Sequence, residues 1–379
     1  MFIYQQTHRY FAQVAQSLEE LGAEELAELN AQNISPSYRG VYFEADRETL
    51  YRVNYMSRLI TRVLAPLLTF QCHSTGYLYR KAKGIPWKDL FMIDHSFAVE
   101  ATLSNSKINH SQYAALCLKD AIVDYFREDC GKRPDVKRLD PDVGVNLHID
   151  NNRATISLDT SGSSLHRRGY RKESVEAPMQ ETVAAAIIRL TRWDGSTPLY
   201  DPMCGSGTLI SEALMQHCHI PAGILRKQFG FIFLPDYDAA GWKRVKARAD
   251  QQIRGLPPGL ISGSDMSAKA ISAAKANNRN LPNGENISLE VKDFRDIEGL
   301  TQRVIVSNPP YGIRTNKRQD LHGFYKTLGD YLKHQCKGSS AYIYFGNREL
   351  IKHIGLKPSW KRGLMNGGLD GRLVRYDLY

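Results

Sequence analysis

Four short segments in the second half of the sequence carry residues that could bind a nucleotide-like ligand and act on a planar amino group. The first reads Asp-Pro-Met-Cys-Gly-Ser-Gly-Thr over residues 201–208 and follows a short apolar run. Gly205 and Gly207 would allow a sharp turn and a close approach of the backbone to a ligand. The third glycine of a dinucleotide-binding fingerprint is missing, and so is the Gly-Lys-Ser/Thr of a P-loop. A simple tight turn between a strand and a helix would also explain this segment.

Two further segments place acidic residues directly after predicted strands. Gly-Ser-Asp-Met-Ser over residues 263–267 contains Asp265, which could accept hydrogen bonds from both hydroxyls of a ribose or could simply begin a helix. Lys-Asp-Phe-Arg-Asp over residues 292–296 contains Asp293 and Phe294. Asp293 could accept a hydrogen bond from an adenine amino group while Phe294 packs on the ring. Each of these two segments is a weak signal by itself.

The fourth segment, Ser-Asn-Pro-Pro-Tyr-Gly over residues 307–312, is the most specific. Pro309 and Pro310 fix the backbone and remove two donors, so their carbonyl groups point in set directions. The Asn308 side-chain oxygen and the Pro309 carbonyl can then accept hydrogen bonds from an amino group on a base, which turns the nitrogen lone pair towards an electrophile. Tyr311 offers a face for base stacking, a contribution of about 1–3 kcal/mol. A proline-rich turn after a buried strand is the simpler alternative.

The elements around these segments alternate between strands and helices. A helix is predicted from about Pro178 to Leu190. This alternation is typical of an α/β fold with a parallel sheet covered on both faces. Ligands of such folds bind outside the carboxyl ends of the strands, where all four segments fall. The predicted strands are Leu199–Tyr200, Leu260–Ser262, Ile287–Val291, Val304–Val306, Ala341–Phe345 and Leu373–Tyr376.

The first half of the chain reads as α+β, without a glycine-rich turn. Val41 and Phe43 alternate as in a short strand, and Asp150-Asn151-Asn152 favours a hairpin turn between two runs of period two. Those two runs are Val143, Val145, Leu147 and Ile149, then Ala154, Ile156 and Leu158. Helical spacing predicts one helix through Phe11, Val14, Leu18 and Leu21 and a second through Ala115, Leu118, Ile122 and Phe126.

Length and composition set broad limits. A chain of 379 residues suggests two or three domains. With 50 Lys and Arg against 40 Asp and Glu, the net charge of +10 favours a polyanionic partner. Six irregularly spaced cysteines indicate a reduced, cytosolic protein. The N-terminus lacks the apolar core of a signal peptide and no run approaches about 18 apolar residues, so we expect a soluble cytoplasmic protein.

In this order and at these strand ends, the four segments resemble those of class I S-adenosylmethionine-dependent methyltransferases that methylate amino groups. The resemblance implies S-adenosylmethionine as cofactor and a Rossmann-like domain. It places Asp201, Gly205 and Gly207 along the methionine part, Asp265 at the ribose and Asp293 at the adenine. The full cofactor set is Glu181, Asp201, Met203, Cys204, Gly205, Gly207, Thr208, Asp265, Met266, Asp293, Phe294 and Asn308. The catalytic set is Asn308, Pro309, Pro310 and Tyr311, which would hold the target base.

The stretch over residues 159–171 narrows the resemblance to THUMP-containing methyltransferases that make N2-methylguanosine in large-subunit rRNA. The first half is similar to their ferredoxin-like segment, over residues 1–55, and to their THUMP module, over 56–165. The methyltransferase domain would occupy 166–379. Ala-Pro-Met-Gln-Glu-Thr over 177–182 resembles the motif that enters this domain, where Glu181 would approach the cofactor. Relatives often show Cys-Arg where this sequence has Gly371-Arg372, and some carry a second methyltransferase domain.

A basic cluster with an aromatic residue inside it lies between the two halves. Arginine pairs with phosphates and stacks on bases, so the cluster suits an RNA backbone. A solvated linker is the other interpretation. The residues predicted to bind RNA are His166, Arg167, Arg168, Tyr170 and Arg171.

The predicted function is therefore methylation of the N2 amino group of a guanosine in a structured element of large-subunit rRNA, with the base flipped or unpaired. N6-adenine methylation of DNA or RNA stays open, because the motif at 307–312 contacts an amino group and not the rest of the base. A non-catalytic RNA-binding assembly factor is the second alternative. No metal is expected, because Cys204, His217, Cys218 and His219 lack paired-ligand spacing. Chemistry at cytosine C5 would need a cysteine where Tyr311 stands.

Overall fold

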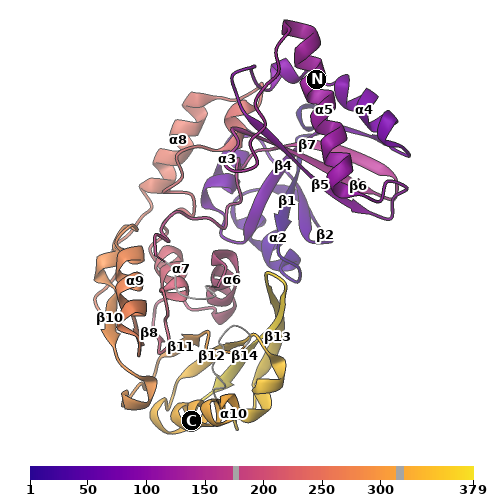
Figure 1. The fold of residues 1–379 in the computed structure, drawn as a ribbon. Coiled ribbons are helices and arrows are strands. Elements are labelled where there is room, and N and C mark those ends of the chain that lie inside the picture. The colour runs from indigo at the N-terminus through magenta and orange to yellow at the C-terminus, as the bar shows by residue number, and fades with distance from the viewer. Residues whose placement is uncertain (174–178, 313–319) are drawn as a thin grey trace. The chain divides into compact units, whose positions relative to one another are not determined.

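The computed structural model describes residues 1–173, 179–312 and 320–379, and the chain divides into two compact units (Figure 1). The first unit comprises residues 1–14, 22–167 and 226–247, and the second comprises 15–21, 168–225 and 248–379. The stretch 226–247 joins the first unit because its aromatic side chains pack there. The ring centroids of Phe231 and Trp242 lie 4.6 and 6.2 Å from that of Tyr51. In the described part of the chain, no helix has the length and apolar character needed to cross a membrane.

The first unit is built on one seven-stranded sheet with the order β2-β3-β1-β4-β7-β6-β5. Long β4 pairs with β1 and with β7, so it joins the two halves of this sheet. The strands are β1 (Arg9–Val14), β2 (Gln32–Ser37), β3 (Gly40–Glu44), β4 (Ile60–Gln71), β5 (Phe97–Ser104), β6 (Val143–Asp150) and β7 (Arg153–Asp159). The helices are α1 (Ile3–Thr7), α2 (Glu19–Glu28), α3 (Arg47–Met56), α4 (Thr75–Lys83) and α5 (Ser111–Cys130).

The predicted helix through Phe11 and Leu21 is wrong. Residues 9–14 form β1, in which Tyr10, Ala12 and Val14 are buried with a period of two, and α2 begins only at Glu19. The apolar spacing mimicked a helix because a strand and a helix follow each other within a few residues.

Three other predictions for this unit are confirmed. The strand around Val41 is β3, the helix around Leu118 is α5, and β6 and β7 form the predicted hairpin. Asn151 and Asn152 have φ of +48° and +59°, the backbone conformation that a two-residue type I′ turn requires.

The second unit contains a seven-stranded sheet with the order β10-β9-β8-β11-β12-β14-β13. Its first five strands are parallel to one another, as predicted. The strands are β8 (Leu199–Asp201), β9 (Ile261–Asp265), β10 (Ser288–Val291), β11 (Val304–Ser307), β12 (Ser340–Phe345), β13 (Trp360–Asn366) and β14 (Leu369–Asp377).

The expectation of a fully parallel sheet is wrong at one edge. β14 pairs antiparallel with both β12 and β13, and β13 had not been predicted. The pair β13–β14 is a hairpin that turns at Gly367, whose φ is +62°, so β14 has to run back along the sheet. Parallel sheets of this kind often carry such an antiparallel edge.

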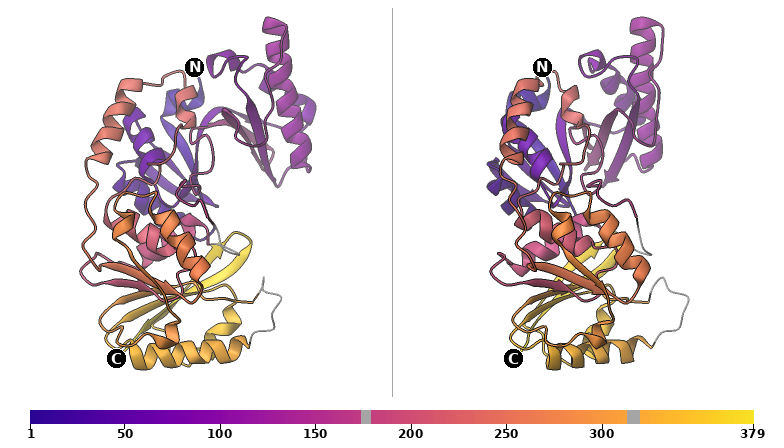
Figure 2. Two further views of the ribbon diagram at one scale, coloured as in Figure 1. Left: turned by 60° about the vertical axis from the view of Figure 1, so that its left-hand side comes forward. Right: turned by 90° about the vertical axis from the view of Figure 1, so that its left-hand side faces the viewer.

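Helices cover both faces of the second sheet (Figure 2). On one face, α10 (Leu321–Gln335) packs with β11, β12 and β14 in a cluster that includes Leu328, Ile343 and Val374. The other face carries α6 (Glu181–Thr191), α7 (Thr208–His217) and α9 (Ala268–Asn278). The predicted helix from Pro178 corresponds to α6, while Ala177 and Pro178 of the entering motif lie outside the described residues. α8 (Ala239–Asp250) lies between α7 and β9 in the sequence.

Candidate active site

The loop after β8 turns sharply at its two glycines. Gly205 and Gly207 have φ of +54° and +87°, a conformation that favours glycine. A Cβ on Gly207 would lie 3.2 Å from the Cβ of Ala274 on α9. The Gly207 N–H donates to the Cys204 carbonyl oxygen at 2.8 Å. The loop therefore makes the sharp turn that the sequence predicted, directly before α7.

Asp201, at the end of β8, stabilises this loop through a buried side chain. It is 2% exposed, and its carboxylate accepts a hydrogen bond from the Met203 N–H at 3.1 Å. Burial raises the pKa of Asp201 to about 7, the nearby Asp265 carboxylate acts in the same direction, and the Met203 hydrogen bond opposes both. The buried Asp201 carboxylate therefore helps to organise the turn through its hydrogen bond to Met203, and its predicted contact with the cofactor stays a prediction.

Asp265 connects this loop with the end of β9. One carboxylate oxygen accepts from the Gly205 N–H at 3.0 Å, and the other accepts from the Ser267 N–H at 2.9 Å. A Cβ on Gly263 would lie 3.0 Å from the Asp201 carbonyl oxygen, so glycine is needed for the two strand ends to approach. Each carboxylate oxygen has further lone pairs, and the half-buried group can accept the two hydroxyls of a ribose. Here the structure brings two of the predicted segments together.

The segment after β10 is placed nearby but differs in detail from the prediction. The Lys292 N–H donates to the Asp265 carbonyl oxygen at 3.1 Å, so this segment also adjoins the end of β9. The Asp293 carboxylate pairs with the Arg295 guanidinium at 2.6 Å, and this hydrogen bond lowers the pKa of Asp293. Asp293 can still meet an adenine amino group through its second lone pairs. Met266, 71% exposed, offers an apolar side chain beside Asp265.

Phe294 belongs to the core. It is 5% exposed, and its ring packs edge-on against Phe324 and Tyr331 with centroid distances of 5.7 and 5.4 Å. This packing leaves no exposed ring face for an adenine, so the predicted stacking of Phe294 on the cofactor is wrong. Its packing fixes the 3-10 turn, Phe294–Asp296, that begins at Asp293.

The Asn-Pro-Pro-Tyr segment follows β11, the neighbour of β8 in the sheet. The Asn308 Oδ1 is buried and accepts no hydrogen bond from any described residue. A buried acceptor without a partner carries a free-energy cost of about 1–3 kcal/mol, so a ligand donor is expected there. The Tyr311 ring lies against the carboxyl end of β12. Gly346 directly follows this strand, and a Cβ on Gly346 would lie 2.8 Å from the Tyr311 Cγ.

Tyr325 on α10 fixes this segment, and sequence reasoning missed it. Its hydroxyl donates to the Pro310 carbonyl oxygen at 3.1 Å, and burial raises the pKa of this tyrosine. The Pro310 carbonyl is therefore engaged within the protein, while the Asn308 Oδ1 and the Pro309 carbonyl remain the two acceptors predicted to meet a base. Tyr325 stands fourteen residues after Tyr311 in a helix, and nothing local in the sequence indicates this contact.

Two members of the predicted RNA-binding cluster are buried. Arg168 and Tyr170 are each 1% exposed, and both reach the Glu212 carboxylate of α7, at 3.3 and 3.2 Å. A buried guanidinium needs such a partner, so the two residues stabilise the unit and cannot contact RNA. That part of the prediction is wrong, and so is the alternative of a solvated linker.

Arg171 lies at the end of the glycine turn over residues 201–208, which is the predicted cofactor loop. Its guanidinium donates to the Thr208 hydroxyl at 3.0 Å and to the Met179 carbonyl at 2.8 Å, and it pairs with Glu181 at 3.4 Å. Burial raises the pKa of Glu181, while the Arg171 charge opposes this shift. The structure therefore groups Arg171 with Glu181 and Thr208, two of the predicted cofactor residues.

Asn277 on α9 holds the segment around Lys172 in place, and the sequence did not predict this role. Its side-chain oxygen accepts from the Lys172 and Glu173 N–H groups at 2.8 and 3.0 Å. Its amide nitrogen donates to the Ser206 carbonyl of the cofactor loop at 3.1 Å. One buried side chain thus joins two segments that are far apart in the sequence. The run Asn277-Asn278-Arg279-Asn280 was the available signal.

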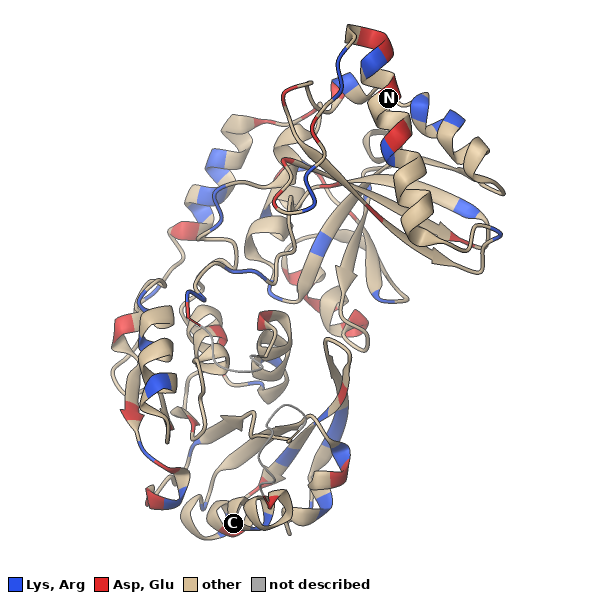
Figure 3. Cartoon of the chain, viewed as in Figure 1, with Lys and Arg blue, Asp and Glu red and all other residues tan. Residues whose placement is uncertain are grey.

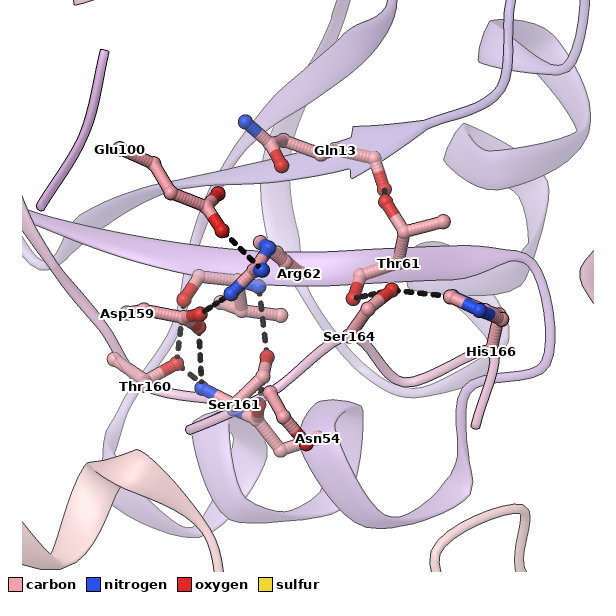
Figure 4. A network of polar contacts seen from close by, with 12 residues as sticks. Gln13, Asn54, Thr61, Arg62, Glu100, Asp159, Thr160, Ser161, Ser164 and His166 are labelled. Carbon is pink, nitrogen blue, oxygen red and sulfur yellow. Dashed lines mark hydrogen bonds and ion pairs between the residues drawn. The ribbon is translucent and has the colours of Figure 1, made fainter. Parts of the chain in front are cut away.

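His166 and Arg167 lie in the first unit. Arg167 is exposed, and His166 Nδ1 lies 2.7 Å from the Ser164 hydroxyl (Figure 4). Their contact with RNA stays a prediction. Among residues 1–173, 179–312 and 320–379, no group of three or more His, Cys, Asp or Glu side chains is placed to hold a metal ion.

The Rossmann-like sheet, with a glycine turn, an acidic residue and the Asn-Pro-Pro-Tyr segment at the ends of three adjacent strands, is that of class I S-adenosylmethionine-dependent methyltransferases. The chain belongs to the RMKL-like methyltransferase family, whose domain model matches residues 168–375. A THUMP domain model matches residues 73–159, and a model of the RlmL ferredoxin-like domain matches 9–64. The resemblance of both halves of the chain is therefore confirmed. S-adenosylmethionine is the cofactor of this class, and the Gly205–Asp265 cradle fits it.

Similar proteins cover nearly all of the chain. A protein of Synechocystis sp., provisionally named RNA methyltransferase slr0064, is 40% identical over 98% of this chain and 97% of its own. Ribosomal RNA large subunit methyltransferase K/L of Syntrophotalea carbinolica is 38% identical over 98% of this chain, which spans 53% of that relative. The crystal structure of SMU.472, described as a methyltransferase complexed with SAH, has a TM-score of 0.86 at 27% identity, with 98% of both chains covered.

Replacement of Gly207 by alanine should weaken cofactor binding. The new Cβ meets the left-handed φ of +87° and the Ala274 side chain at 3.2 Å. We expect a loss of about 1–2 kcal/mol in the free energy of unfolding, measured by chemical denaturation. The dissociation constant for S-adenosylhomocysteine, measured by calorimetry, should be larger than that of the wild type. Gly259→Ala is the control, since its φ is +72° but nothing lies within 4 Å. Wild-type affinity in Gly207→Ala would contradict the assignment.

Proposed function

We propose that this protein transfers a methyl group from S-adenosylmethionine to the exocyclic N2 amino group of a guanosine in large-subunit rRNA. The observation that carries the proposal is the Asn308 Oδ1, a buried acceptor with no partner among the described residues. Asn308 follows β11 and directly precedes the two rigid prolines. It lies beside the ends of the strands that carry the proposed cofactor residues. An amino group is the ligand that such an acceptor lacks.

The cofactor supplies an electrophilic methyl group on a sulfonium. The protein therefore has to bind and orient the cofactor and the target base and to exclude water. In the proposal, Asp265 accepts the ribose hydroxyls, and Asp293 and Met266 contact the adenine. The loop over 203–208, with Met203, Cys204 and the two glycines, lies along the methionine part. Glu181, a buried carboxylate beside Arg171, matches the amino group of that part. These roles support a transfer that depends on proximity and alignment.

The target base is held by the segment after β11. The Asn308 Oδ1 and the Pro309 carbonyl accept the two amino hydrogens, which directs the nitrogen lone pair towards the methyl group. Tyr311 stacks on the base, and Tyr325 keeps the Pro310 carbonyl in place. Preorganised acceptors of this kind act without reorganisation at the moment of reaction. In the proposal, the amino nitrogen would form its bond to the methyl carbon as the carbon–sulfur bond breaks, so no covalent enzyme intermediate is needed. One of the two amino protons would then be released to solvent with the product.

Several observations support RNA as the substrate. The THUMP match and the names of the relatives concern RNA methylation. The chain carries a net charge of +10, and Lys and Arg occur on both units (Figure 3). The proposal divides the chain into 1–55, 56–165 and 166–379, with the first two parts capturing a structured rRNA element in the cytoplasm. His166 and Arg167 are proposed to contact its backbone.

The proposal predicts the product directly. The purified protein, labelled S-adenosylmethionine and rRNA lacking the modification should give labelled N2-methylguanosine in nucleoside analysis. Genomic DNA offered in parallel is the control and should stay unlabelled. Labelled N6-methyladenine from either nucleic acid would contradict the guanine assignment while leaving the site intact. Tight binding of cofactor without label in either would favour an assembly factor.

Asn308→Ala should reduce transfer at least about 100-fold, because it removes the acceptor that orients the amino group. The dissociation constant for S-adenosylhomocysteine, measured by calorimetry, should stay close to that of the wild type. Asn308→Asp keeps an acceptor oxygen at this place and should retain measurable turnover. Wild-type turnover in Asn308→Ala would show that this side chain does not hold the base.

A further inference from the structure

The N-terminal part of the first unit has the strand and helix order β1-α2-β2-β3-α3-β4, with β1 and β3 central in the sheet order β2-β3-β1-β4. One face of these strands is covered by helices. Val14, Val41 and Phe43 are buried on that face, and a Cβ on Gly22 of α2 would lie 2.9 Å from the Val14 side chain. Since side chains alternate along a strand, the residues between these point to the opposite face.

That opposite face carries two aromatic residues directly across from each other. Phe11 of β1 pairs in register with Tyr42 of β3, and their ring centroids lie 4.8 Å apart at 54°. Tyr42 is 38% exposed and Phe11 is half-buried. Neither residue has a proposed catalytic or cofactor role. Phe11 lies on one of the two central strands, and Tyr42 lies on the other.

Gly40 and Arg9 give this pair a particular geometry. A Cβ on Gly40 would lie 2.1 Å from the Phe11 Cζ, so only glycine lets the Phe11 ring lie across β3. The Arg9 guanidinium lies 4.7 Å from the centroid of the Tyr42 ring. Arg62 of β4, which lies opposite Gln13 of β1, is held in ion pairs by Asp159 and Glu100 (Figure 4). Arg9 is therefore the cation that accompanies the aromatic pair.

We propose that this face, defined by Arg9, Phe11 and Tyr42, binds a single-stranded RNA segment by base stacking. One common RNA-binding module is a four-stranded sheet on whose aromatic residues two or three bases stack, and the β2-β3-β1-β4 part of the seven-stranded sheet presents Phe11 and Tyr42 on its two inner strands in a comparable way. Aromatic stacking tolerates any base, and a guanidinium beside the ring pairs with the phosphate of the same nucleotide. The site would hold an unpaired stretch next to the structured element, and it rests on the proposed RNA substrate.

A protein partner fits this face less well. The exposed neighbours on β2 are polar, with Gln32, Asn33 and Ser35, and the aromatic patch itself contains two rings. Stable protein interfaces need a larger apolar centre. A single strand of nucleic acid needs no more than stacked rings and a cation.

Binding of a fluorescein-labelled ten-nucleotide oligouridylate to the full chain tests the proposal, with anisotropy measured at low salt and without cofactor. Phe11→Leu and Tyr42→Leu keep apolar bulk but remove the ring, and each should weaken binding about fivefold or more. Tyr42→Phe should bind like the wild type. Tyr38→Leu is the matched control, because Tyr38 is 77% exposed on the same part of the chain but stands in the turn before β3.

Thermal unfolding and affinity for S-adenosylhomocysteine verify that each variant is folded. Equal binding by wild type, Phe11→Leu and Tyr42→Leu would overturn the proposal. So would competition by duplex RNA as strong as that by the single strand. Asn308→Ala should bind the oligonucleotide normally, and the assay requires no methylation. A failure of this proposal is therefore distinct from a failure of the proposed reaction.

Discussion

The arrangement of the active site depends on the two backbone hydrogen bonds that Asp265 accepts. Its carboxylate oxygens hold the Gly205 and Ser267 N–H groups, which ties the glycine turn after β8 to the end of β9. Charge-assisted hydrogen bonds of this kind are stronger than neutral ones. They fix the position of the turn relative to the end of β9, where Asp265 has further lone pairs.

The parallel order of the strands extends this constraint to the base site. β8 lies between β9 and β11, so cofactor residues and Asn308 must meet at one edge of the sheet. Around that edge, buried residues on other elements hold the backbone: Tyr325 fixes Pro310, and Asn277 fixes Ser206. The Asn308 Oδ1 is buried without a protein donor in the described chain. In the proposed function, this acceptor gains its donor when a base binds.

The sequence predicted the strand ends and their motifs because these depend on local features, namely glycine turns, prolines and apolar runs. It did not predict contacts between distant residues. Arg168 looked like a solvent-exposed RNA ligand because its partner, Glu212, lies 44 residues away. Phe294 looked like a cofactor contact because α10, which buries it, follows later in the chain. The antiparallel β13–β14 edge was missed since a hairpin and a parallel strand leave similar apolar patterns. Phe11 was misread because a strand and a helix together gave helical spacing.

The most direct test of the site is the affinity of Asp265→Asn for S-adenosylhomocysteine. An amide has one acceptor oxygen, so this variant can keep the Gly205 or the Ser267 hydrogen bond but not both, and it also loses the charge that is proposed to face the ribose. Titration calorimetry should show at least about tenfold weaker binding, which corresponds to about 1.4 kcal/mol, in a chain that remains folded. Unchanged affinity would contradict the account, since the cofactor would then be held without the link between β8 and β9.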